Sequence, residues 1–374
     1  MIHIVPSITN KSAGPSYSVV RLCENLINRG LNLKLATLDD GKSNLPQFVK
    51  TFSNELFYKK LGYSKTLYNW IDYQIKQDPK MIIHNHSLWM MPNIYPGMVS
   101  KKYNNPVVIS PRGTLSKWSF KNGSFMKRLM WFFLQKKNIE NCFCFHATSE
   151  LECKEIKLLG FRNPVAVIPN GIDIYKGKSK SLIIKKKKRL LFLGRIHKKK
   201  GLDILFNIWN KIKMTQNDWE LKIVGPDDGY LKDLKLIKKK LSLSDVIFSE
   251  KKEGDEKWDE FLNADLFILP SHSENFGMAI AEALSVGLPV ITTKNTPWKD
   301  LKNYNAGWCA EVNEKSLYEN IINAMQLDQK QLFKIGDNGK KWMEREFNWE
   351  IVATKMLSTY RWIENKEKKP DFIF

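Results

Sequence analysis

Short apolar runs alternate with amphipathic segments along most of the chain. The run over residues 266–269 is closed by Pro270, and a segment rich in helix formers follows before Gly287 and Pro289 introduce the next apolar run. An apolar run closed by turn residues is typical of a strand buried on both faces of a parallel sheet. The pattern therefore predicts an α/β chain whose sheets are parallel and doubly wound.

The first half of the pattern predicts a helix over residues 17–29 and strands over residues 2–8, 33–38, 81–86, 107–113, 143–149 and 165–168. Gly14 lies in the loop after the first strand, where a glycine lets the backbone pass close to a ligand. His86 and Arg112 end two later strands. Doubly wound folds bind ligands at the carboxyl ends of their strands, so both are candidate site residues. The alternative for His86 is a purely structural histidine.

A polar and very basic stretch at residues 175–189 interrupts the pattern and is expected to be a linker. Residues 1–174 before it are predicted to form one domain, and residues 190–348 after it a second. An amphipathic helix opens the C-terminal segment, residues 349–374. A chain of 374 residues is long enough for two domains with sizeable cores.

Two glutamates stand out after the strand at residues 266–269. Glu274 and Glu282 are eight positions apart, and eight residues at about 3.6 per helical turn return a side chain to within roughly 80° of its starting direction. Both carboxylates are therefore expected to face one crevice. Asn275, Phe276 and Gly277 are expected to offer backbone N–H groups at the helix start, which suits an anion. The alternative is a solvated helix face.

Basic residues follow the first strand of the second domain. The strand over residues 190–196 ends at Gly194 and Arg195, and Lys200 stands just before a glycine and a helix over residues 202–212. A guanidinium and an ammonium group so placed suit a diphosphate, because charge-assisted hydrogen bonds to phosphate are strong.

The E-N-F-G motif at residues 274–277, followed by E-A-L at residues 282–284, closely resembles the glutamate-pair signature of the retaining glycosyltransferases of family 4. The resemblance implies the GT-B architecture, in which two Rossmann-like domains face each other across a cleft. It implies that Glu274 contacts hydroxyl groups of the donor sugar and that Glu282 holds the ribose of the nucleotide. The glycine-arginine and lysine-glycine pairs also resemble the family, which implies that Arg195 and Lys200 bind the donor diphosphate.

The first domain resembles the family more loosely. Family members usually carry two adjacent glycines whose N–H groups approach the donor phosphates, whereas this chain has Ala13 and Gly14. Several members have a histidine where this chain has Arg112, so that histidine's role is not carried over. Whether His86 or Arg112 contacts the acceptor stays open. The resemblance also implies that the last helix crosses back to the first domain.

The formal net charge of +21 is the unusual feature of the composition. It favours a polyanionic partner, either nucleic acid, an anionic membrane surface or a phosphate-bearing substrate. The alternative for part of the charge is a plain preference for lysine on solvent faces. No nucleic-acid-binding motif is recognisable, so nucleic acid is not expected as a partner. Residues 116–138 interleave cations such as Lys127 and Arg128 with aromatic residues such as Trp131 and Phe132. This predicts either a core helix with a cationic outer side or a surface helix in contact with anionic lipid.

We expect a retaining transferase that moves a hexose or N-acetylhexosamine from a nucleotide diphosphate sugar to a saccharide linked to a lipid diphosphate, as in O-antigen and other surface polysaccharide assembly. By family habit, a UDP-sugar is favoured over GDP-mannose. Arg195 and Lys200 supply positive charge, so no metal or cofactor is expected, and Asp227 and Asp228 are interpreted as turn residues. The alternatives are a sugar-nucleotide or polyanion-binding protein without turnover, and a sugar-nucleotide epimerase.

The expected location is the cytoplasm, peripheral on the inner face of the plasma (inner) membrane. No run of about 18 apolar residues is present, and the amino terminus is interpreted as a strand and not as a signal peptide. The five cysteines lie in apolar surroundings without metal-like spacing, and are expected to be buried thiols.

Overall fold

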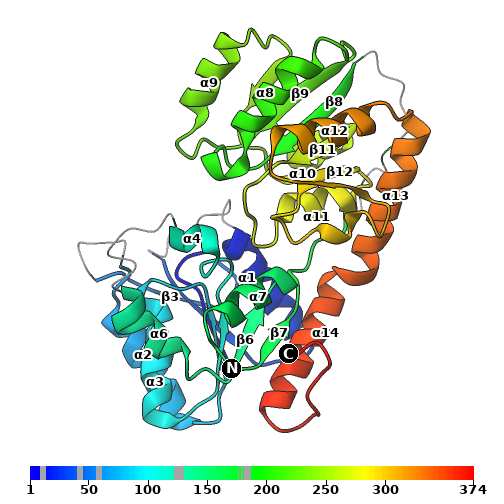
Figure 1. The fold of residues 1–374 in the computed structure, drawn as a ribbon. Helices are drawn as coiled ribbons and strands as arrows, with labels where there is room; N and C mark the ends of the chain where they lie inside the picture. The colour runs from blue at the N-terminus through cyan, green and yellow to red at the C-terminus, as the bar shows by residue number, and fades with distance from the viewer. Residues whose placement is uncertain are drawn as a thin grey trace. The chain divides into compact units, whose positions relative to one another are not determined.

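The computed structural model describes residues 1–8, 14–39, 45–55, 61–121, 130–175, 177, 180 and 187–374. The chain divides into two compact units (Figure 1). Unit 1 consists of Met1–Gly171 with Trp349–Phe374, and unit 2 of Ile172–Asn348. Each unit is a parallel sheet with helices, as the alternating pattern predicts.

Unit 1 contains a seven-stranded parallel sheet in the order β3-β2-β1-β4-β5-β6-β7. Its strands are β1 (Ile2–Ile4), β2 (Lys34–Leu38), β3 (Val49–Phe52), β4 (Ile83–His86), β5 (Val107–Ser110), β6 (Cys144–Ala147) and β7 (Val165–Val167). Its helical segments are α1 (Gly14–Ile27), α2 (Lys65–Gln77), η1 (Met91–Asn93), α3 (Tyr95–Tyr103), α4 (Lys117–Lys121), η2 (Trp131–Gln135), α6 (Lys136–Ile139), α7 (Glu150–Leu158) and α14 (Trp349–Ile363).

The two faces of the unit 1 sheet carry different cores. On one face Ile2 and Ile4 of β1 pack in a cluster with apolar residues of α2 and α3. The other face is covered by α1 and α14, which lie side by side (Figure 1). Because successive side chains of a strand point to opposite faces, β1 turns His3 towards this second face. His84 of β4 and His146 of β6 are buried with it.

Unit 2 contains a six-stranded parallel sheet in the order β10-β9-β8-β11-β12-β13 around one apolar core. Its strands are β8 (Lys188–Leu193), β9 (Trp219–Val224), β10 (Val246–Ser249), β11 (Leu266–Leu269), β12 (Val290–Thr293) and β13 (Gly307–Ala310). Its helical segments are η3 (Lys198–Lys200), α8 (Leu202–Ile212), α9 (Leu231–Lys240), α10 (Gly254–Leu262), α11 (Met278–Ser285), η4 (Lys299–Leu301), α12 (Glu314–Met325) and α13 (Gln329–Glu346).

The apolar pattern predicted strongly buried elements better than charged ones. β11 and α8 have the predicted bounds. The first strand ends at Ile4 instead of residue 8, because Pro6 cannot donate to a ladder. α1 begins at Gly14 instead of residue 17, since Pro15 suits the first helical turn. α9 was not predicted, because it buries only Leu234 and is otherwise rich in lysine.

The basic and aromatic segment at residues 116–138 divides between core and surface. Trp131 is only 6% exposed and packs against Trp89, with 5.8 Å between the ring centroids, so the core alternative holds for this residue. Phe133 is 76% exposed. Lys127 and Arg128 lie outside the described residues, as does the side chain of Phe132.

Within the described ranges, no helix combines the length and the apolar character needed to traverse a bilayer. The five cysteines are free thiols, of which three are buried and two are partly buried.

Candidate functional site

Gly201 allows the backbone beside Lys200 to lie close to the end of β11. Gly201 has a left-handed backbone (φ +67), and a Cβ there would lie 2.3 Å from the carbonyl oxygen of Pro270, directly after β11. Only glycine fits so close an approach. The backbone N–H of His272 also donates to the carbonyl of Lys199 at 2.8 Å. The lysine-glycine pair therefore holds Lys200 at the carboxyl edge of the unit 2 sheet.

Glu274 and Lys200 form a nearly buried ion pair at this edge. Glu274 Oε1 accepts hydrogen bonds from Lys200 Nζ and from Ser271 Oγ, both at 2.6 Å. The side chains of Lys200 and Glu274 are 14% and 11% exposed. Burial alone would raise the pKa of Glu274, but the Lys200 charge and the two hydrogen bonds outweigh it and lower that pKa. Glu274 is therefore an ionised hydrogen-bond acceptor at neutral pH.

Glu282 has a different partner, Lys257 of α10. Lys257 Nζ donates to Glu282 Oε1 at 3.0 Å, and the Glu282 side chain is 15% exposed. Burial raises the pKa of Glu282, and Lys257 offsets that rise only in part, while the negative charge of Asp173 adds to it. This edge of unit 2 thus holds two carboxyl groups with opposite pKa shifts, each beside its own lysine.

The prediction that a helical repeat aligns the two glutamates is wrong. α11 begins at Met278, and Gly277 before it has a left-handed backbone (φ +79). Glu274 therefore lies in the loop and only Glu282 lies in the helix, a little over one turn from its start. The strand–loop–helix connection, and not the helical period, positions the two carboxyl groups.

The three residues that follow Glu274 lie in the loop and at the start of α11, where their backbone N–H groups were predicted to be. Phe276 is 4% exposed and packs on Trp298 at 5.3 Å between ring centroids, so its side chain belongs to the core. Its carbonyl accepts a hydrogen bond from Trp298 Nε1. Asn275 lies in the loop, and Gly277 is the residue that caps α11. Any ligand contact of Phe276 is left to its backbone.

Arg195 follows β8 but pairs with Asp228 and not with the Lys200–Glu274 pair. Its Nη1 donates to Asp228 Oδ2 at 2.8 Å, and the two side chains are 55% and 40% exposed. An exposed pair contributes about 0–1 kcal/mol to stability, so an anion can replace Asp228 at little cost. The turn interpretation holds for Asp227, whose Oδ1 accepts from three backbone N–H groups at 3.0 Å.

In unit 1, the predicted site residues His86 and Arg112 are in contact. Arg112 Nε donates to His86 Nδ1 at 3.3 Å, and Arg112 Nη1 donates to Ser18 Oγ at 3.0 Å and to Asn170 Oδ1 at 2.9 Å. His86 is fully buried, whereas Arg112 is 8% exposed. Burial lowers the pKa of Arg112 to about 10, so the guanidinium remains charged at neutral pH. Arg112 is the more exposed of the two, and His86 accepts one of its hydrogen bonds.

Gly14 begins α1, and a Cβ on it would meet no described atom within 4 Å. Close approach to the described neighbours is therefore not the reason for a glycine here. Residues 9–13, which precede it, lie outside the described residues.

Sequence reasoning missed the partners of these groups. Ser18 and Asn170 hold Arg112, while Ser271 and Lys257 hold the two glutamates. Asn170 had a detectable signal, since it stands in a Pro-Asn-Gly turn at the end of the first domain. Lys257 had none, because one lysine on a charged helix is not distinctive.

Two family profiles together match most of the chain. The profile described as "Glycosyl transferases group 1" matches residues 174–342, and the profile described as "Glycosyltransferase Family 4" matches residues 13–176. Among curated relatives, the capsular polysaccharide biosynthesis glycosyltransferase CapM of Staphylococcus aureus is 25% identical over 177 residues, which are 45% of this chain and 44% of CapM. The chain spans about half the length, or less, of the curated relatives it matches.

Solved structures share the fold over nearly the whole chain. Sucrose-phosphate synthase from Thermosynechococcus elongatus has a TM-score of 0.77 at 18% identity, covering 98% of this chain and 99% of that one. HepE from Anabaena, in complex with UDP and glucose, has a TM-score of 0.76 at 19% identity, covering 96% and 98%. Profiles and fold agree, and the chain belongs to the family 4 glycosyltransferases, with a GT-B fold of two Rossmann-like domains.

Proposed function

We propose that the protein is a retaining, metal-independent glycosyltransferase that uses a nucleoside diphosphate sugar, with a UDP-sugar favoured over GDP-mannose. The observation that carries the proposal is the Lys200–Glu274 pair, which Gly201 holds at the carboxyl edge of the unit 2 sheet. An ammonium group and an ionised carboxylate side by side suit a ligand that carries a phosphate next to sugar hydroxyl groups. The fold shared with a UDP-bound protein supports this choice of donor.

In this proposal the bond between the anomeric carbon and the diphosphate oxygen breaks, and its electron pair goes to the diphosphate. The acceptor oxygen bonds to the same face of the sugar, and its proton passes to the leaving phosphate. Lys200 and Arg195 stabilise the negative charge that builds on the diphosphate. Because two cations supply this charge, the reaction needs no metal ion. Glu274 binds hydroxyl groups of the sugar, and Glu282 binds the ribose.

The proposed acceptor is a saccharide linked to a lipid diphosphate, in the assembly of a surface polysaccharide such as O-antigen. The capsular polysaccharide role in the name of the related CapM supports a polysaccharide acceptor. The net charge of +21 and the exposed Phe133 support contact with an anionic membrane surface. We place the protein in the cytoplasm, on the inner face of that membrane.

A transfer assay tests the proposal against its alternatives. Purified protein is incubated with radiolabelled UDP-sugars and a membrane extract, and label in the lipid fraction is followed with time. Transfer, with retained anomeric configuration by NMR of the product, is the expected result. Donor binding without transfer would indicate a binding protein, and conversion of the donor sugar without an acceptor would indicate an epimerase.

The ribose contact has its own test. Glu282→Gln should weaken UDP binding by about 2–4 kcal/mol, since a charged hydrogen-bond acceptor is lost. Titration calorimetry measures the change. Glu260→Gln is the matched control, because Glu260 is also nearly buried in unit 2 and also pairs with a lysine, Lys222, at 2.6 Å. Equal affinity losses in both variants would contradict the assignment.

A further inference from the structure

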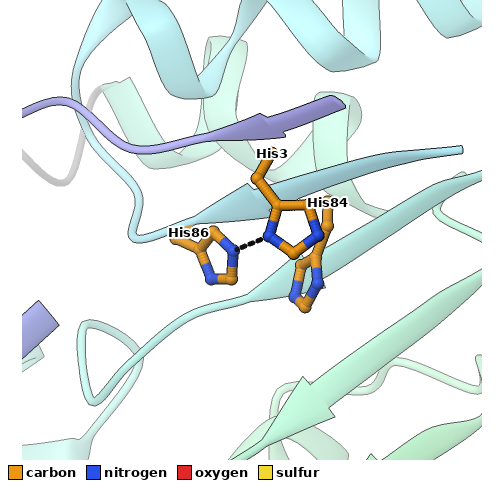
Figure 2. Close-up of side chains that lie close together, drawn as sticks. All are labelled: His3, His84 and His86. Carbon is orange, nitrogen blue, oxygen red and sulfur yellow. Dashed lines mark hydrogen bonds between the residues drawn. The ribbon is translucent and has the colours of Figure 1, made fainter. Parts of the chain in front are cut away.

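Unit 1 buries four histidines where an apolar core is expected. His3, His84, His86 and His146 come from β1, β4 and β6, and each is at most 2% exposed. They lie on the sheet face that α1 and α14 cover, and His3, His84 and His86 lie together in Figure 2. Buried polar groups are costly without hydrogen-bond partners, so the contacts of these rings need an account.

The four rings and Tyr360 of α14 form one continuous chain of hydrogen bonds. The chain begins where Arg112 Nε donates to His86 Nδ1 at 3.3 Å. The next contacts join His86 Nε2 to His3 Nδ1 at 3.1 Å, and His3 Nε2 to the Tyr360 hydroxyl at 3.2 Å. The hydroxyl lies 2.6 Å from His84 Nδ1. The last two contacts join His84 Nε2 to His146 Nδ1 at 3.4 Å, and His146 Nε2 to the Ile168 carbonyl at 2.9 Å.

The two ends of the chain set the direction of every bond in it. Arg112 can only donate, so His86 Nδ1 must accept, and the proton of this neutral ring is on Nε2. By the same reasoning, His86 Nε2 donates to His3 Nδ1 and His3 Nε2 donates to the Tyr360 hydroxyl. The hydroxyl then donates to His84 Nδ1, and His84 Nε2 donates to His146 Nδ1. The far end agrees, because the Ile168 carbonyl can only accept and therefore also requires a proton on His146 Nε2. All four rings are thus neutral Nε2–H tautomers, and each donates once and accepts once along the chain.

This direction argues against a metal ion at the histidines. His3, His84 and His86 have ring nitrogens within 4.8 Å of one another, a spacing that fits a metal site. Every ring lone pair, however, already accepts a hydrogen bond. His86 Nε2 and His3 Nδ1 are joined by a hydrogen bond (Figure 2), and Cys23 Sγ lies 3.4 Å from the same His3 nitrogen. Burial lowers the pKa of His3 and of His146 to about 3, which agrees with neutral rings.

Arg112, at the head of the chain, has the features of a ligand-binding residue. Its backbone is left-handed (φ +54), which is uncommon for a residue other than glycine and is often found at functional sites. It follows β5, at the carboxyl edge of the sheet. Its hydrogen bonds to described residues use Nε and Nη1, which leaves Nη2 without a bond to the described part of the chain.

We infer that His86 is the positioning residue for Arg112, and that the hydrogen bonds from His86 through His3, Tyr360 and His84 to His146 keep its Nδ1 free of a proton so that it can accept from Arg112. The aligned bonds present an acceptor to Nε, while Ser18 and Asn170 hold Nη1, so the planar guanidinium has one orientation. Nη2 is then held ready for an anionic group of the substrates. Only the nature of that anion, a phosphate, rests on the proposed glycosyl transfer. Through Tyr360, the last helix of the chain takes part in ordering this site.

Two substitutions at His86 separate positioning from folding. In His86→Asn the amide oxygen takes the place of Nδ1 and can still accept from Arg112, but the link to His3 is lost. In His86→Gln the amide nitrogen takes the place of Nε2 and can still donate to His3, but nothing accepts from Arg112. Each variant removes one bond of the same buried ring, so the two are matched in stability cost.

The orientation of Arg112 is measured directly by NMR of the full-length protein with ¹⁵N-labelled arginine. The wild type and His86→Asn should show an Arg112 Nε–H signal protected from exchange, and His86→Gln should lose that protection. Protection kept in His86→Gln would overturn the inference. This measurement does not need turnover, so a failure of the proposed reaction leaves it decisive.

Turnover tests whether His86 acts through Arg112. His86→Gln should lower kcat/KM at least tenfold, and His86→Asn no more than about threefold. In an Arg112→Lys background, His86→Gln should have no further effect, because lysine has no Nε–H for the ring to hold. Equal losses in both His86 variants, or losses that multiply with Arg112→Lys, would show that the histidines serve folding alone.

Discussion

The two units differ in the groups that surround a buried charge near the end of a strand. In unit 2 each site carboxyl group has a lysine beside it, Lys200 for Glu274 and Lys257 for Glu282. In unit 1 Arg112 makes its hydrogen bonds to neutral groups, among them His86, and the buried Glu152 acts on it through its charge without a hydrogen bond. An ion pair neutralises charge and can exchange its partner for a substrate group. A neutral hydrogen-bond chain leaves the charge in place and determines its direction.

The largest effect on stability is expected when Glu274 of unit 2 loses the lysine beside it. Lys200→Ala leaves Glu274 buried without its cation and should lower the free energy of unfolding by about 3–5 kcal/mol. Arg195→Ala breaks only an exposed pair and should change it by at most about 1 kcal/mol. Both variants should reduce turnover more than tenfold, because in the proposed reaction both charges stabilise the leaving diphosphate.

Chemical denaturation measures the effect of each variant on stability, and transfer kinetics measure its effect on turnover. Lys198→Ala is the control, since Lys198 is exposed on the same turn and should be mild in both measurements. If all three substitutions act alike on turnover, the basic run is a general anion attractor and the separate roles are wrong.

Next in size is a comparison of two glycines, one from each unit. Gly201→Ala places a Cβ 2.3 Å from the Pro270 carbonyl on a left-handed backbone. It should lower the free energy of unfolding by about 2–4 kcal/mol and weaken UDP binding. Gly14→Ala meets no described atom within 4 Å, so it should stay within about 0.5 kcal/mol. A severe loss of stability in Gly14→Ala would point to a close neighbour of that residue outside the described part of the chain.

A smaller effect is expected at the surface. Phe133 of unit 1 and Met214 of unit 2 are 76% and 79% exposed apolar residues. If unit 1 contacts lipid, Phe133→Ala should weaken binding to anionic vesicles by about 1–2 kcal/mol, roughly tenfold, and binding should fall as salt rises. Met214→Ala should leave vesicle co-sedimentation unchanged. Equal effects of the two substitutions, or no wild-type binding, would remove the support for a membrane-facing side of unit 1.

The smallest expected effect concerns how stability depends on pH, because Glu274 and Glu282 should contribute to it with opposite signs. The folded pKa of Glu274 is lowered, so its contribution to stability is present above the unfolded value, about 4.5, and is lost as the pH falls through the folded value. The folded pKa of Glu282 is raised, so its contribution is present below about 4.5 and is lost as the pH rises through the folded value. Each pKa unit corresponds to about 1.4 kcal/mol.

Urea unfolding between about pH 3 and pH 7 measures these two contributions. The stability of Glu274→Gln relative to wild type should decrease with rising pH, and that of Glu282→Gln should increase. Slopes of the same sign would mean that the two lysine partners do not distinguish the carboxyl groups.

Local sequence determined much of unit 2. The apolar run of β11, the helix α8 and the lysine-glycine pair before it are short-range signals, because strand burial, helix periodicity and a left-handed turn each depend on a few neighbouring residues. The family motif at residues 274–277 singled out Glu274 as a candidate without the structure, and its burial beside Lys200 was added by the fold. The predicted geometry between the two glutamates was wrong, because Gly277 has a left-handed backbone and the helix begins only after the motif.

Only the tertiary structure decided the roles of the unit 1 residues. His86 was a strand-end histidine with two open interpretations, and the role we infer for it depends on a chain of hydrogen bonds whose members come from β1, β4, β6 and α14. Tyr360 and His3, which touch in that chain, are 357 positions apart in the sequence. A hydrogen bond requires a particular atom at a particular distance, and the proton position on each ring is set by the groups at both ends of the chain. No local pattern carries that information, which is why the sequence offered Arg112 as a candidate but not the residues that hold it.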